Sequence, residues 1–112
     1  MRTDPARLAD ILAAIARIQK YSERGRDSFL QDELLQTWIV HNLQIIGEAV
    51  SRVTDTLKKL HPEVQWTQIA AMRNLIIHDY FGVDLDQIWR VAERDIPKLR
   101  EQVETILKTS NE

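Results

Sequence analysis

The order of apolar and polar residues predicts helices along most of the chain. Apolar residues recur every three or four positions after the sequence TDP, as on one face of a helix, and this spacing stops at SERGRD. Thr3 or Asp4 is a suitable N-cap, Pro5 suits the first turn, and Gly25 is the expected stop. We therefore expect a first helix between these signals, with a buried face made of Leu8, Ile11, Leu12, Ile15 and Ile18.

A second, longer helix is expected from Asp27 or Ser28 to about Leu57. Gly47 lies inside it, where glycine costs roughly 1 kcal/mol relative to alanine and usually has a packing reason. We therefore expect a neighbouring helix to cross at Gly47. The predicted buried stripe of this helix consists of Leu34, Ile39, Ile46, Ala49, Val50, Val53 and Leu57.

The rest of the chain predicts two further helices. Pro62 ends the long pattern, and a short third helix should carry TQIAAMRNLIIHD up to Gly82. The fourth should begin at Asp84, with Gln87 placed as in a capping box, and should kink or restart at Pro97. The predicted fold is all-α: an up-and-down bundle of four main helices, or five if Pro97 divides the last, in a single domain over residues 1–112.

Composition narrows the classes of protein that this bundle can belong to. The chain has 112 residues, of which 44% are hydrophobic and 29% charged, and it has no cysteine, which excludes disulfides and thiolate chemistry. No apolar run approaches the roughly 20 residues that span a bilayer, so we expect a cytoplasmic protein without a membrane partner. The formal net charge is −2, so any contact with nucleic acid must come from a local basic site or from assembled subunits.

The sequence RNLIIHDYFG places Arg73, Asn74, His78 and Tyr80 close together near an expected helix end. A guanidinium binds phosphate oxygens through a fork of donors, and an imidazole can transfer a proton near neutral pH. This chemistry suits metal-free RNA cleavage by the adjacent 2′-hydroxyl. On a regular helix, however, residues five apart point about 140° away from each other, so Arg73 must reach His78 where the helix is distorted or ends.

One histidine cannot act as base and acid at once, so the hypothesis includes a symmetric homodimer that brings two motifs to one cleft. The alternative is structural: His78 caps the carbonyl end of its helix, and Arg73 is a solvated surface charge. Glu48 could face the motif and pair with Arg73. Trp38, Trp66 and Trp89 are expected to be core or interface anchors, two of which could mark the dimer contact.

A metal site is not expected. The three histidines lie on different segments without the paired spacing of a zinc motif, and the nearby aspartates lack the glycine and distal glutamate of a calcium loop. We therefore expect neither a metal nor another cofactor. A packing role is expected for His41 and a loop position for His61.

The segment RNLIIHDYFGVD resembles the Arg-x4-His-x-Tyr signature of the HepT family (DUF86 type), within the HEPN superfamily. IIGEAV, LHPEVQW and DLDQIWRVAERDIPKL also resemble that family, so the likeness covers nearly the whole chain. It implies a HEPN-type bundle and a toxin of a toxin–antitoxin system. The toxin would be a metal-independent RNA endonuclease with Arg73 and His78 as catalytic residues and Asn74 in support.

The same resemblance implies a partner and a mode of control. The partner would be a nucleotidyltransferase antitoxin of the MNT type, which inhibits the toxin by AMPylation of Tyr80. AMP attached two residues from His78 would bring negative charge and bulk to the phosphate site. Two alternatives stay open: a non-catalytic, nucleotide-binding accessory subunit of a nucleotidyltransferase, and a purely structural helical dimer.

Overall fold

The computed structural model describes residues 2–75 and 84–110, and these residues are helical with no strand, which confirms the all-α prediction. None of the helices in these ranges is long and apolar enough to cross a membrane. The elements are α1 (Asp4–Ser22), α2 (Arg26–Gln31), α3 (Glu33–Arg52), α4 (Asp55–Leu60), α5 (Trp66–Ala70), the 3-10 helix η1 (Ala71–Asn74), α6 (Leu85–Arg90), the π-helix η2 (Val91–Asp95) and α7 (Ile96–Ser110).

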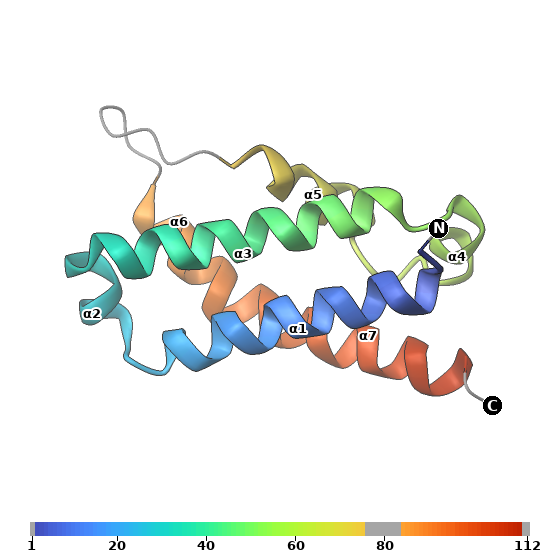
Figure 1. The fold of residues 1–112 in the computed structure, drawn as a ribbon, viewed down its shortest axis with the longest axis horizontal. Coiled ribbons are helices and arrows are strands. Elements are labelled where there is room, and N and C mark those ends of the chain that lie inside the picture. The colour runs from blue at the N-terminus through green and yellow to red at the C-terminus, as the bar shows by residue number, and fades with distance from the viewer. Residues whose placement is uncertain (1, 76–83, 111–112) are drawn as a thin grey trace.

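Helices α1 and α3 run antiparallel side by side, and α7 packs along α1 (Figure 1). Helix α5 and η1 lie along α3 at the edge of the bundle. Burial of one aliphatic side chain stabilises a fold by roughly 1.5–3 kcal/mol, so the apolar stripes of the long helices hold this arrangement together. The fully buried side chains include Leu8, Ile11, Ile15 and Ile18 of α1, Ile39, Leu43, Ile46 and Val50 of α3, and Ile96, Val103 and Ile106 of α7.

The first helix has the predicted ends. The Thr3 hydroxyl accepts a hydrogen bond from the Ala6 amide at 3.2 Å, and Pro5 lies in the first turn. After the helix, Gly25 has a φ of +90°, a conformation that side chains with a Cβ rarely adopt. Leu12 alone of the predicted stripe is only half-buried.

The single long helix predicted next is wrong, because the chain forms three helices there. Asp32 leaves helical geometry, and its carboxylate accepts hydrogen bonds from the Leu34 and Leu35 amides, which begins α3. Val53 is extended and ends α3. Thr54 follows Val53 and accepts a hydrogen bond from the Leu57 amide, which begins α4. At both breaks, Asp32 and Thr54 use a short polar side chain to bind amides that a continuous helix would pair with carbonyls.

The break at Asp32 also changes which leucine is buried. Leu34, predicted in the buried stripe, is 82% exposed, whereas Leu35 is buried. The other predicted members of the stripe are buried, apart from the half-buried Leu57.

The helix predicted to carry both Arg73 and His78 ends between them. It consists of α5 and η1, and Leu75 after it is extended with φ −63° and ψ 126°. The predicted site residues His78 and Tyr80, and the predicted stop Gly82, lie outside the described residues.

The last part of the chain follows its prediction. The Asp84 carboxylate accepts a hydrogen bond from the Gln87 amide at 3.2 Å and caps α6. Pro97 has no amide hydrogen to donate to the Glu93 carbonyl. The π-helix η2 occupies the preceding turn, and the α-helix restarts at Ile96.

Candidate active site

Arg73 is placed by a close crossing of two backbones. A Cβ on Gly47 of α3 would lie 2.3 Å from the Arg73 amide nitrogen and 2.9 Å from the Met72 carbonyl carbon. Only glycine permits this approach, because real Cβ atoms do not come so near to backbone. The predicted crossing at Gly47 is therefore confirmed, and the crossing element is η1.

Two further side chains of α3 hold the same segment. The Gln44 amide group donates a hydrogen bond to the Leu75 carbonyl, immediately after η1. A carboxylate oxygen of Glu48 lies 4.0 Å from a terminal nitrogen of Arg73, so the predicted pairing of these residues is confirmed as a long ion pair. Residues 44, 47 and 48 share one face of α3, which fixes both Arg73 and the direction in which the chain leaves it.

Glu48 also accepts a hydrogen bond from the Arg52 Nε at 2.7 Å. This bond, together with the positive charges of Arg52, Arg73 and Arg7, lowers the pKa of Glu48, against a smaller opposing effect of desolvation. Glu48 is therefore a carboxylate at neutral pH. It can orient arginines but cannot act as a proton donor there.

Arg73 lines a cleft of about 710 Å3 between α1 and α3. Four arginines and two carboxylates line this cleft, so positive charge is concentrated in a chain whose net charge is −2. Its lining consists of Arg7, Asp10, Ala13 and Arg17 of α1, of His41, Gln44, Ile45, Glu48, Ala49 and Arg52 of α3, and of Arg73. We call this site the cationic cleft.

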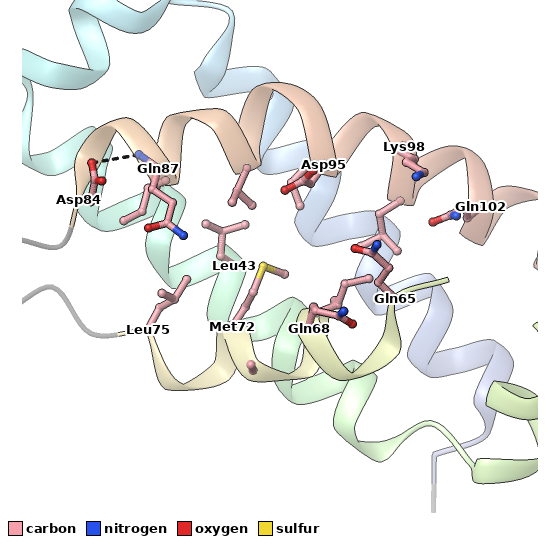
Figure 2. Close-up of a pocket in the computed structure, with 16 residues that line it drawn as sticks. Leu43, Gln65, Gln68, Met72, Leu75, Asp84, Gln87, Asp95, Lys98 and Gln102 are labelled. Atoms are coloured by element: carbon pink, nitrogen blue, oxygen red, sulfur yellow. Dashed lines mark hydrogen bonds between the residues drawn. The ribbon is translucent and has the colours of Figure 1, made fainter. Parts of the chain in front are cut away.

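A second cavity beside η1 has different chemistry (Figure 2). Met72 and Leu75 line this cavity, of about 580 Å3, which also contains Leu43 and other apolar side chains. The charged residues of this cavity are Asp84, Asp95 and Lys98, which leaves its rim with more negative than positive charge. A phosphate is favoured in the cationic cleft rather than in this cavity.

Of the other predicted site residues, the structure describes only some. The Asn74 side chain is exposed next to Arg73, whereas His78 and Tyr80 lie outside the described residues. Sequence reasoning missed six polar or charged lining residues: Arg7, Asp10, Arg17, His41, Gln44 and Arg52. Their helical spacing within each helix was a signal, since residues 41, 44, 48 and 52 share a face. The spacing does not, however, predict which face of α1 packs against which face of α3.

The remaining histidines and tryptophans have structural surroundings. His41 is exposed and stacks on Trp38 with ring centroids 5.7 Å apart, and His61 lies 3.2 Å from Glu63. Trp66 and Trp89 are buried as expected of core anchors, whereas Trp38 is 39% exposed. In the described part of the chain, no three histidine or carboxylate side chains cluster in a way that could hold a metal ion.

Comparison with known proteins gives consistent relatives. The family model described as ribonuclease HepT-like matches residues 11–106. A protein of Thermococcus cleftensis named "Probable ribonuclease HepT" is 39% identical over 90% of this chain and 93% of its own length. "Putative RNase TTE0752" of Caldanaerobacter subterraneus subsp. tengcongensis is 40% identical over 73% of each chain. No solved structure matches significantly. Because these matches cover most of its length, the chain belongs to the ribonuclease HepT-like family.

Proposed function

We propose that this protein is the toxin of a toxin–antitoxin system and acts in the cytoplasm as a metal-independent RNA endonuclease. Two of its relatives carry ribonuclease names, and the family model is described by the same activity. The observation that carries the proposal is Arg73, which three residues of α3 hold at the edge of a cleft with four arginines.

The reaction needs three kinds of group. The 2′-hydroxyl of one nucleotide gives its proton to a base and attacks the adjacent phosphorus. The bond from phosphorus to the 5′ oxygen then breaks, and that oxygen receives a proton from an acid. The products are a 2′,3′-cyclic phosphate and a 5′-hydroxyl. Negative charge grows on the non-bridging oxygens, where a fixed cation stabilises the transition state.

We assign these roles to the motif. Arg73 binds the reacting phosphate, because its guanidinium is held at the cleft and is 50% exposed. His78 transfers protons, and Asn74 supports the site. Glu48 is a positioning residue, since it is ionised and lies between Arg52 and Arg73.

A homodimer completes this assignment, because a base and an acid are both required and each chain supplies one motif histidine. Of the three tryptophans, Trp38 is the one with enough exposed surface to serve in the dimer contact.

We propose that an MNT-type nucleotidyltransferase antitoxin controls the protein at the same site, by AMPylation of Tyr80. AMP linked to Tyr80 would carry a phosphate two residues from His78. That phosphate would compete with the reacting RNA phosphate for Arg73, and the nucleotide would add bulk where the substrate binds.

The test is incubation of the purified protein with an RNA and with a DNA of the same sequence, in the presence of EDTA. We expect loss of the RNA alone and no loss with Arg73→Ala or His78→Ala. Arg94→Ala removes an exposed charge that does not line the cleft, and it should cleave normally. Undiminished cleavage by His78→Ala would remove this residue from the mechanism.

The alternative function is a non-catalytic, nucleotide-binding accessory subunit of a nucleotidyltransferase. The cationic cleft favours it as a second candidate, because arginines that hold an RNA phosphate can equally hold a nucleotide phosphate. Binding without RNA loss in the same assay supports this alternative.

A further inference from the structure

Three arginines of the cationic cleft have no role in the proposed reaction at a single phosphate. Arg7 and Arg17 lie on α1, ten residues apart, and Arg52 lies near the end of α3. All three line the cleft together with Arg73. Since repulsion between cations disfavours such a cluster, an anionic ligand would relieve a cost that the two carboxylates relieve only in part.

The three arginines differ in how they are held. Arg17 is anchored, because its Nε donates a 2.7 Å hydrogen bond to Asn42, which is fully buried and donates in turn to the Trp38 carbonyl. Arg52 is paired with Glu48. By contrast, no hydrogen bond or ion pair holds the Arg7 guanidinium within residues 2–75 and 84–110. The cleft thus contains anchored cations and one cation whose donors are available.

The size and lining of the cleft suit a short ligand chain. Ala13 and Ala49 lie among the arginines, and their small side chains leave space between α1 and α3. The volume of about 710 Å3 is within the range of roughly 300–1,000 Å3 that is usual for ligand clefts. This volume is large enough for a short stretch of single strand.

We propose that the cationic cleft binds the sugar–phosphate backbone of single-stranded RNA beside the reacting phosphate, with Arg7, Arg17 and Arg52 on the flanking phosphates. The proposal rests on the proposed ribonuclease function, because it takes the phosphate on Arg73 as the starting point. Arginine fits this role, since its planar donor fork matches phosphate oxygens. The lowered pKa of Glu48 supports the proximity of the cations, because Arg52, Arg73 and, least, Arg7 all contribute to it.

The experiment measures binding of a single-stranded 2′-O-methyl oligoribonucleotide, whose blocked 2′ oxygen cannot attack phosphorus. Affinity is measured by fluorescence anisotropy at several salt concentrations. One phosphate contact to a single strand contributes about 0.7 to the slope of log K against log salt, equivalent to about fivefold in affinity at 0.1 M salt. We expect Arg7→Gln to lose about this much, and Arg94→Gln, with the same change in net charge, to lose nothing.

A second pair of variants tests the site without removal of an arginine. Ala13→Glu places a carboxylate in the cleft, whereas Ala16→Glu places it on an exposed part of α1 outside the cleft. We expect Ala13→Glu to weaken RNA binding more than Arg7→Gln does, and Ala16→Glu to have a small effect. Helix content is compared by circular dichroism.

The outcomes separate this inference from the proposed function. Weaker binding by Arg7→Gln and Ala13→Glu supports the inference even if the wild type does not cleave RNA. Cleavage by the wild type with unchanged binding by both variants overturns the inference and leaves the nuclease intact. A shift of either variant from dimer to monomer in analytical ultracentrifugation also overturns it, because the cleft would then be a contact between two copies of this chain.

Discussion

Replacement of Gly47 by alanine tests the crossing that places Arg73. The new Cβ would lie 2.3 Å from the Arg73 amide nitrogen, and ordinary contact begins at 3.4 Å, so η1 must move by about 1 Å. Backbone atoms lie on the other side of the contact, and no flexible side chain end can yield instead.

The magnitude follows from two opposing effects on the free energy of unfolding. Alanine inside a helix gains about 1 kcal/mol over glycine, while overpacking costs roughly 1–3 kcal/mol. We therefore expect a net destabilisation of up to about 2 kcal/mol. The effect on RNA cleavage should be larger, since a misplacement of about 1 Å can cost on the order of 100-fold in rate.

The assay combines urea unfolding with single-turnover RNA cleavage. Thr37→Ala, an exposed change in the same helix, serves as the control and should leave the cleavage rate unchanged. A Gly47→Ala protein that is about 1 kcal/mol more stable than the wild type and cleaves RNA normally would refute the reasoning. In that case η1 would not depend on the missing Cβ.

Three further outcomes are expected. Glu48→Gln should bind the 2′-O-methyl oligonucleotide more tightly in anisotropy, because it removes a competing anion. It should cleave RNA more slowly, because it also removes the partner that orients Arg73. Equal effects on binding and cleavage would contradict a positioning role. Gln44→Ala should lower the rate of cleavage and leave RNA affinity near the wild-type value, because it releases the Leu75 carbonyl and not a cation; an unchanged rate would contradict this. Co-expression with an MNT-type nucleotidyltransferase should add the mass of AMP to the protein, and Tyr80→Phe should abolish the gain in mass spectrometry; a gain retained in that variant would place the modification elsewhere.

The elements that the sequence predicted well are those with local signals at both ends. The first helix has a cap at Thr3, a proline in its first turn and Gly25 after its end, all within a few residues of its bounds. Asp84 and Pro97 act in the same local way around α6 and α7. Hydrogen bonds between near neighbours decide these ends, so a single sequence contains the information.

The prediction of one long helix was wrong because a short polar residue can occupy either of two places, inside a helix or at its start. An aspartate such as Asp32 can lie on the exposed face of a continuous helix or begin a new helix as its cap. Apolar residues continue at nearly helical spacing across the break, so periodicity does not separate the two cases. The contrast between exposed Leu34 and buried Leu35 depends on how α2 packs against α3, which is a tertiary property.

In the candidate site, too, local features were predictable from the sequence and tertiary ones were not. The pairing of Glu48 with Arg73 and the crossing at Gly47 were predictable, because a glycine inside a helix signals a close neighbour. The cationic cleft was not, since Arg7 and Arg52 are 45 positions apart in sequence and meet only through the packing of α1 on α3.

Because the helix ends before Leu75, the sequence spacing between Arg73 and His78 no longer gives the angle between their side chains. The angle of about 140° between residues five apart holds only on a continuous helix. Since Leu75 is extended, that angle no longer separates the two side chains. What fixes the start of the path from Arg73 is instead the contact with α3, at Gly47 and through the hydrogen bond of Gln44 to Leu75. The position of Arg73 and of the Leu75 carbonyl therefore depends on α3, through Gly47 and Gln44, as much as on the residues of the motif.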